Sequence, residues 1–151
     1  MKREYPDRPF VGVGAIIVEC GQVVLIRRGK PPLEGEWSIP GGAMELGETI
    51  REAVMREALE ETGLVVEPLD LVGVFDRLVK DVEGRVLYHY VLVDFLCRSK
   101  GGILKASGDA AEAKWCKAEE IAELNLPDDT AEVIRQGIKK ATDSANITKH
   151  P

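Results

Sequence analysis

The sequence predicts an α/β fold, specifically an α/β/α sandwich around a mixed β-sheet. Three observations point to it: short β-rich stretches bounded by glycine and proline, one helical segment in mid-chain, and a second near the end. The 151 residues fit one domain. We place that domain at residues 1–141 and expect the polar residues 142–151 to form a flexible C-terminal tail.

Six segments have the β-branched and aromatic content of strands: residues 11–19, 23–28, 37–39, 65–77, 86–97 and 111–116. A turn at Gly21 separates the first two, which predicts a hairpin. Residues 29–35 contain two prolines and are expected to form a loop. The Pro-Gly-Gly run at 40–42 is expected to break the third strand.

Three helices are expected, at residues 49–62, 119–124 and 128–141. Thr49 and Glu52 have the spacing of a capping box at the start of the central helix. Gly63 stands where a left-handed residue commonly ends a helix. The central helix is therefore defined at both ends.

Three carboxylates lie in the last two turns of this helix. At about 100° per residue, Glu57, Glu60 and Glu61 fall on one face within roughly a 100° arc. Like charges so placed destabilise a helix by a few tenths of a kcal/mol per pair. Only arginines, and no lysine, accompany them on the helix. A hard divalent cation with oxygen ligands would offset the repulsion.

The apolar residues of the same helix indicate where these acids lie. Ala53 and Val54 point to the same side as the acids, so the inward stripe becomes acidic as the helix proceeds. We therefore expect the acids at the edge of the core, in a cleft. Met55 and Leu59 form a second apolar stripe, which predicts a helix covered on two sides.

The spacing from the glycine loop through the helix resembles the Nudix hydrolase motif, G-x5-E-x7-R-E-U-x-E-E-x-G-U, where U is bulky and apolar. Its fixed positions are filled by Gly42, Glu48, Arg56, Glu57, Glu60, Glu61, Gly63 and Leu64. Ala58 takes the first U position, where a larger residue is usual. So many fixed positions over 23 residues make the motif far more specific than a lone glycine-rich loop.

The resemblance implies a Nudix-type sandwich and a metal-dependent hydrolase. It assigns one to three Mg²⁺ or Mn²⁺ ions to Glu57, Glu60 and Glu61, with the Gly42 carbonyl as a further ligand. The remaining implied site residues act around these ligands. Arg56 would pair with Glu48 and hold the carboxylates in place. The base that activates water is either a box glutamate or a downstream loop glutamate, for which Glu112 is the candidate.

The resemblance leaves the substrate open. Segments around residues 8–13, 26–32 and 35–42 look like those of small microbial ADP-ribose pyrophosphatases, so ADP-ribose, cleaved to AMP and ribose 5-phosphate, is the first expectation. Residues 78–81, past the motif, lack the proline associated with ADP-ribose and the tyrosine associated with dinucleoside polyphosphates. A (d)NTP or oxidised-nucleotide pyrophosphatase is the alternative. A non-hydrolytic nucleotide-sensing module is an alternative of another class, although such modules usually have a degraded motif.

The composition limits the classes of molecule that the protein is expected to bind. The net charge of −6 and pI near 5.1 disfavour a nucleic-acid polymer and RNA decapping, which call for a basic patch. Cys20, Cys97 and Cys116 show no C-x-x-C spacing and are typical of reduced cytoplasmic thiols. No signal-peptide or membrane-spanning pattern is visible. Small nucleotides are the expected partners, and a homodimer is possible.

Overall fold

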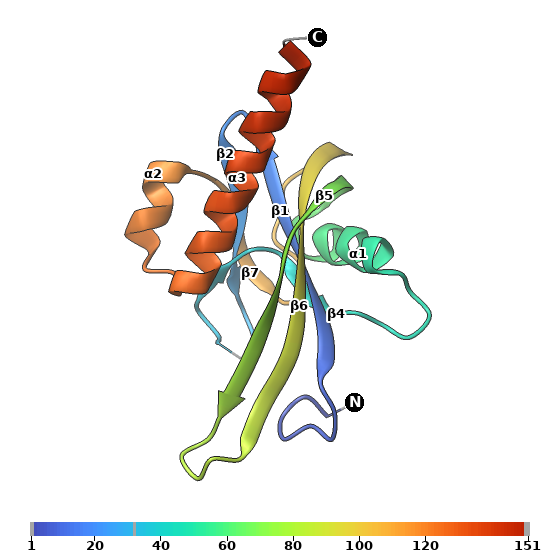
Figure 1. Cartoon of the computed structure of the whole chain (residues 1–151), viewed down its shortest axis with the longest axis vertical. Helices are drawn as coiled ribbons and strands as arrows, with labels where there is room; N and C mark the ends of the chain where they lie inside the picture. Colours follow the sequence, from blue (N-terminus) through green and yellow to red (C-terminus); the bar gives the residue numbers. More distant parts are fainter. Residues whose placement is uncertain (1, 32, 150–151) are drawn as a thin grey trace.

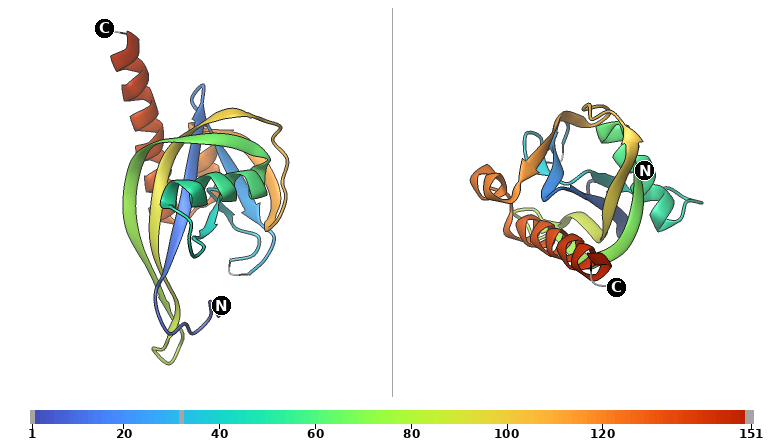
Figure 2. Two further views of the ribbon diagram at one scale, coloured as in Figure 1. Left: turned by 90° about the vertical axis from the view of Figure 1, so that its right-hand side faces the viewer. Right: turned by 90° about the horizontal axis from the view of Figure 1, so that it is seen from above.

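The computed structural model describes residues 2–31 and 33–149 and forms one mixed sheet with helices on both faces (Figures 1 and 2). The strands are β1 (Phe10–Glu19), β2 (Gln22–Arg28), β3 (Trp37–Ser38), β4 (Gly41–Ala43), β5 (Leu64–Lys80), β6 (Val86–Gly102) and β7 (Ala110–Lys117). The helices are α1 (Ile50–Thr62), α2 (Ala118–Ile121) and α3 (Asp128–Lys149), and a 3-10 turn spans Ala122–Leu124. The expected α/β/α sandwich is confirmed.

Strand β1 is the centre of the sheet. It runs parallel to β6 and antiparallel to β2 and β4, and β5 completes the other edge beyond β6. Its residues from Gly12 to Ile17 are all buried, as expected of a strand covered on both faces. Because β2 pairs only with its C-terminal end, the N-terminal half of β1 is free to accept β4.

Two apolar clusters fill the space on either side of the sheet. One joins α1 to β1 and β6 through residues such as Ala15, Val54 and Phe95. The other joins α3 to β1 and β2 through residues such as Ile16 and Ile134. Alternating residues of β1 thus enter opposite clusters, and α1 is held against the face that carries the functional motif.

The structure differs from expectation at two segments. Residues 41–43 form strand β4 rather than a break, because Gly14 and Gly41 let the two backbones meet: a Cβ on Gly41 would lie 2.1 Å from the Val13 carbonyl oxygen. The last helix continues to Lys149 instead of ending near residue 141, so most of the expected flexible tail is helical; residues 150–151 lie outside the described residues. Within the described part of the chain, no helix is both long and apolar enough to cross a membrane.

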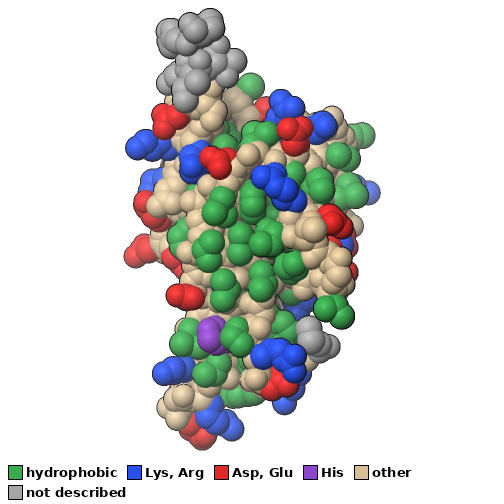
Figure 3. Space-filling model, turned by 45° about the vertical axis from the view of Figure 1, so that its right-hand side comes forward, with side chains coloured by type: hydrophobic (Ala, Val, Ile, Leu, Met, Phe, Trp, Pro, Cys, Tyr) green, Lys and Arg blue, Asp and Glu red, His purple; other side chains and the backbone are tan. Residues whose placement is uncertain are grey.

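One face of the β5–β6 hairpin is uncovered and apolar. The pairing register puts Val11, Leu71, Val74 and Leu78 on the same side of the sheet as α1, and each is about 40% exposed or more. The exposed Asp76 lies on this side too, between Val74 and Leu78. Figure 3 shows hydrophobic side chains gathered across this face with charged groups around them. We call these four residues the open apolar face.

The prediction that α1 is covered on two sides is wrong. Met55 is 39% exposed and Leu59 is 52% exposed, so this side of the helix faces solvent. The opposite side of the helix packs against β1, β4, β5 and β7.

Candidate active site

Helix α1 is fixed at both ends by the residues that its sequence predicts. The Thr49 hydroxyl oxygen accepts from the Glu52 backbone N–H at 3.2 Å, and the hydroxyl also lies 3.0 Å from the Glu52 carboxylate. Gly63 adopts the left-handed conformation (φ 75°), and its N–H donates to the Leu59 carbonyl at 3.0 Å. These caps set the length and rotation of the helix, and therefore where its acids point.

The three helix acids share one cavity but differ in burial. Glu61 is buried (3% exposed), and its Oε1 accepts from the Gly41 backbone N–H at 2.7 Å. The Glu57 side chain is 13% exposed and lies beside Gly42, where a Cβ would meet its Oε1 at 2.5 Å. The Glu60 side chain is 54% exposed. All three line a cavity of about 410 Å³, which we call the acid cavity.

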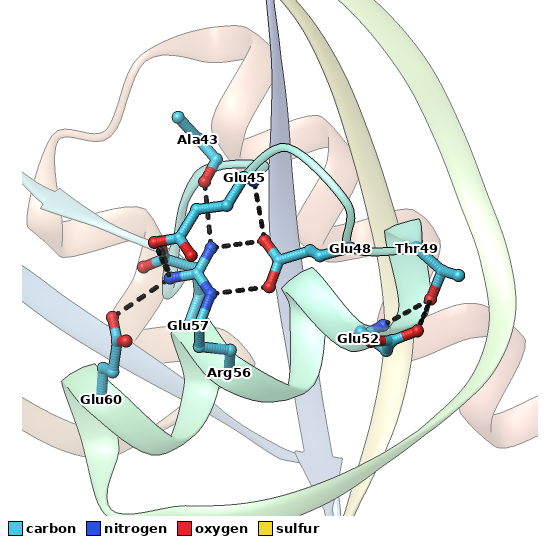
Figure 4. A network of polar contacts seen from close by, with 8 residues as sticks. All are labelled: Ala43, Glu45, Glu48, Thr49, Glu52, Arg56, Glu57 and Glu60. Atoms are coloured by element: carbon cyan, nitrogen blue, oxygen red, sulfur yellow. Dashed lines mark hydrogen bonds and ion pairs between the residues drawn. The ribbon is translucent and has the colours of Figure 1, made fainter. Parts of the chain in front are cut away.

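Arg56 connects the acids to the loop before the helix (Figure 4). Its Nε and Nη2 donate to the two oxygens of Glu48 at 2.8 and 2.7 Å, the pairing that the Nudix resemblance implies. Nη2 also donates to the Ala43 carbonyl at 3.1 Å, and Nη1 reaches Glu57 at 2.9 Å and Glu60 at 3.3 Å. One guanidinium therefore ties the loop, strand β4 and two of the acids together.

Burial dominates the electrostatics of the acid cavity. Desolvation raises the pKa of Glu61 to about 8, against the opposing hydrogen bond from Gly41. Desolvation also raises the pKa of Glu57 above its ordinary value, although Arg56 opposes it. The Arg56 hydrogen bonds lower the pKa of Glu48. Desolvation therefore disfavours the charged form of both Glu57 and Glu61, and a cation bound in the cavity would favour it.

The donor set of the acid cavity suits a hard divalent cation. It offers the carboxylate oxygens of Glu57, Glu60 and Glu61. Gly42 does not line this cavity, but its backbone lies close to the Glu57 carboxylate because no Cβ intervenes. In the described part of the chain, no three acidic, histidine or cysteine side chains already surround one point, since Arg56 contacts Glu57 and Glu60 while Gly41 holds Glu61. A cation bound by all three carboxylates would therefore compete with Arg56 and the Gly41 N–H for them.

Glu112 is not brought to the helix acids. It lies on β7 opposite Arg27 of β2, with which it forms an ion pair, and it does not line the acid cavity. Asp109, in the loop just before β7, lines that cavity instead, pairs with Lys30 at 3.3 Å, and raises the pKa of Glu61 by its charge. In the sequence, Asp109 has the pattern of a solvated loop acid, and its only distinguishing signal is the glycine before it.

A larger cavity lies on the other side of strand β4. It has a volume of about 490 Å³ and is lined mainly by apolar and aromatic side chains, among them Trp37, Phe75 and Tyr90. We call it the aromatic cavity. It shares Arg3 and Ala43 with the acid cavity, and Gly41 and Gly42 also line it. Its one acid that is almost fully buried, Asp94 of β6, was not singled out from the sequence.

Comparisons with known proteins agree with this geometry. A family model described as the NUDIX domain matches residues 8–137. The chain is 38% identical over 116 residues to an ADP-ribose pyrophosphatase of Methanocaldococcus jannaschii, covering 77% of this chain and 66% of that protein. It is 40% identical over 118 residues to an 8-oxo-dGDP phosphatase of Mus musculus, covering 78% of this chain but 33% of that protein.

A solved structure gives the same result for the fold. A MutT NUDIX hydrolase from Burkholderia pseudomallei superposes with a TM-score of 0.74 at 29% identity, covering 86% of this chain and 98% of that one. The motif on α1, the sandwich around it and these matches place the chain in a single class: it belongs to the Nudix hydrolase family. The chain spans about two thirds or less of the length of the curated relatives it matches first.

Proposed function

We propose that the protein is a divalent-metal-dependent pyrophosphohydrolase that cleaves a nucleoside diphosphate linked to another group, with ADP-ribose, giving AMP and ribose 5-phosphate, as the preferred substrate. One observation carries the proposal: an acidic cavity and an aromatic cavity meet at the glycine-rich strand β4. The first suits metal-bound phosphates and the second suits a base. The 38% identity to an ADP-ribose pyrophosphatase supports ADP-ribose.

Each site residue has a defined task in this proposal. Glu57, Glu60, Glu61 and the Gly42 carbonyl would hold Mg²⁺ or Mn²⁺, the ions on which Nudix hydrolases generally depend. When bound, the metal neutralises the diphosphate and lowers the pKa of a water molecule. Arg56 keeps the carboxylates oriented through Glu48 and Ala43. Asp109 replaces Glu112 as the loop acid that could accept the proton of the attacking water, because Asp109 alone of the two lines the acid cavity.

The metal assignment is tested by Glu57→Gln and Glu61→Gln. Each should lower kcat by at least about 100-fold and weaken Mn²⁺ binding measured by calorimetry, with an unchanged circular dichroism spectrum. Glu119→Gln, on the exposed side of α2, is the matched control. If both site variants keep full activity, the metal assignment is wrong.

The base assignment is tested by a second pair of variants. Asp109→Asn should lower kcat and change the acidic limb of the pH–rate profile, whereas Glu112→Asn should leave that limb in place. If only the Glu112 variant changes the acidic limb, Glu112 and not Asp109 is the general base.

The substrate is tested by a panel of ADP-ribose, NADH, diadenosine polyphosphates, dNTPs, 8-oxo-dGTP, 8-oxo-dGDP and nucleotide sugars, following AMP, phosphate and pyrophosphate. The competing candidate is an oxidised-nucleotide or (d)NTP pyrophosphatase, favoured by the 40% and 38% identities to mouse and human 8-oxo-dGDP phosphatases. Faster turnover of 8-oxo-dGDP than of ADP-ribose would select that candidate. Tight binding without turnover of any member would select a nucleotide-sensing module.

We further propose that the protein acts in the cytoplasm as a homodimer joined through the open apolar face. The molecule exposes 8886 Å². A monomer of its mass exposes roughly 7,600 Å², and a standard interface buries about 800 Å² per partner. The β5–β6 hairpin and α3 extend from the body of the molecule and add to its exposed area (Figure 1). The proposal is therefore supported by the open apolar face, a coherent surface on which a second copy could pack.

A further inference from the structure

Asp94 is a buried acid without a hydrogen-bond partner. It is 5% exposed and lines the aromatic cavity, and within the described residues no side chain or backbone group donates a hydrogen bond to it. The nearby Arg77 acts on it only at a distance, because its Nη2 donates to Asp129 at 2.7 Å. Buried polar groups normally have partners, and leaving one without costs about 1–3 kcal/mol. The carboxylate lines the aromatic cavity, so a molecule in that cavity, whether water or a ligand, can supply the donor.

Gly14 of the adjacent strand leaves room for the Asp94 carboxylate. A Cβ on Gly14 of the adjacent strand would lie 2.2 Å from Asp94 Oδ1. Ile39, which lines the same cavity, would lie 2.6 Å from that Cβ. The carboxylate and Ile39 occupy the space that a side chain on Gly14 would need, so a glycine at residue 14 lets Asp94 keep its present position at the wall of the cavity.

Strand pairing places Asp94 in line with the acid cavity. Gly41 of β4 pairs with Gly14 of β1, and Gly14 pairs with Asp94 of β6. Neighbouring strands lie about 4.8 Å apart, so the backbone of Asp94 is roughly 10 Å from that of Gly41. The Gly41 N–H in turn holds Glu61. A ligand with phosphates at the acid cavity could therefore extend past β4 to Asp94.

The walls around Asp94 suit a flat aromatic ring. Trp37, Phe75, Tyr90 and Leu92 line the cavity, and apolar walls with a few polar groups are typical of sites that orient a small molecule. A carboxylate is an acceptor, so it selects a ring that carries an N–H donor on its edge. Purine bases with amino or ring N–H groups meet this requirement.

We propose that Asp94 reads the nucleobase of the substrate, its carboxylate accepting a hydrogen bond from an N–H group on the edge of a purine. This inference rests on the proposed nucleotide hydrolase function and names the residue that selects the base. Burial raises the pKa of Asp94 to about 6, so at pH 7.5 the carboxylate form is the acceptor. The donor is the 6-amino group of adenine or the N1–H and 2-amino groups of guanine.

The test is binding of three monophosphates to the metal-free protein, measured by calorimetry with EDTA at pH 7.5: AMP, GMP and purine riboside 5′-monophosphate, whose ring has no N–H donor on its edge. The wild-type protein should bind AMP or GMP at least about 10-fold more tightly than the purine riboside nucleotide. The tighter binder of AMP and GMP shows whether the site prefers adenine or guanine. Asp94→Leu should reduce this preference below about 3-fold, and Asp143→Leu, on the exposed side of α3, should keep it.

A second variant tests the same hydrogen bond in case Asp94→Leu does not fold. Asp94→Asn keeps the shape of the side chain and should reverse or weaken the preference, because its amide both donates and accepts. A wild-type protein that does not discriminate, or an undiminished preference in both Asp94 variants, would overturn the inference. Hydrolysis by the wild type distinguishes the two proposals: discrimination without any turnover keeps the role of Asp94 and rejects the hydrolase, whereas turnover without discrimination does the opposite.

Discussion

Arg56 holds several groups of the candidate active site in place. Its guanidinium makes two hydrogen bonds to Glu48, one to Ala43 and contacts to two helix acids. The Glu48 side chain is only 13% exposed, so this pair is shielded from water. Such a pair fixes geometry more than it adds stability.

We predict that Arg56→Lys lowers kcat/KM by about 10–100-fold, because a lysine cannot bond both oxygens of Glu48 and the Ala43 carbonyl in one plane. The measurement is steady-state hydrolysis with saturating Mg²⁺, alongside Mn²⁺ binding. Arg135→Lys, on the surface of α3, serves as control. Unchanged kinetics in the Arg56 variant would show that charge alone suffices at this position.

Asp94 gives a pH-dependent prediction. Burial raises its pKa from 3.8 to about 6, so between these values the folded protein holds a proton that the unfolded chain releases. Stability contributed by this group is therefore full below pH 3.8 and is lost as pH rises to about 6. The loss amounts to about 3 kcal/mol, since one pKa unit corresponds to 1.36 kcal/mol.

Denaturant unfolding of the wild type and Asp94→Asn, from pH 4.5 to 7.5, measures this effect. The difference in unfolding free energy between the two proteins should move in favour of Asp94→Asn as pH rises, because the amide does not ionise. A difference that stays constant with pH would contradict the prediction.

At the scale of elements, the turn after α1 decides how the helix meets β5. Gly63 has φ 75°, and a Cβ there would lie 2.5 Å from the Ile103 carbonyl oxygen. Gly84, in the β5–β6 turn, has φ 84° but open space around it. Both glycines have a positive φ that strains any other residue, but only Gly63 also has neighbouring atoms where a Cβ would lie.

We predict that Gly63→Ala destabilises the protein by more than 2 kcal/mol, and Gly84→Ala by about 1 kcal/mol, because only the first adds a backbone clash to the left-handed strain. Thermal unfolding should then place Gly63→Ala at least about 3 °C below Gly84→Ala. Equal melting temperatures would mean that residues near 103 move aside without cost.

The elements that the sequence predicts best are those whose signals are local. Both ends of α1 follow from Thr49 and Gly63, and the acids follow from their positions on that helix. Strand β4 could not be predicted, because it exists only where two glycine-containing backbones meet across the sheet. The wrong interpretation of Met55 and Leu59 has the same origin, since periodicity shows that a face is apolar but not what covers it.

Two acids that line the cavities, Asp109 and Asp94, could not be predicted for a similar reason. Whether Asp109 or Glu112 reaches the acid cavity depends on the pairing of β7 with β2, which shifts by a bulge at Arg27 and Arg28. The burial of Asp94 depends on the parallel register of β6 with β1. Neither register can be read from the residues themselves.

At the scale of the whole molecule, the open apolar face predicts a change of assembly. Val74→Lys places a charge in the middle of that face and should convert a dimer into a monomer, measured by light scattering after size exclusion at about 10–100 μM protein. Val82→Lys, at the fully exposed tip of the hairpin, should leave the dimer intact. A monomeric wild-type protein over this range would reject the proposed homodimer.

The parallel pairing of β1 with β6 also determines the order in which the chain can fold. Phe10 pairs with Tyr90, roughly 80 residues further along, so this pairing closes a long loop and carries a large entropic penalty. The β5–β6 hairpin and α1 involve only neighbouring segments and can form first. Gly14, Asp94 and Gly41 come together only when β1 joins them, so the aromatic cavity depends on this long-range pairing and cannot form from local contacts alone.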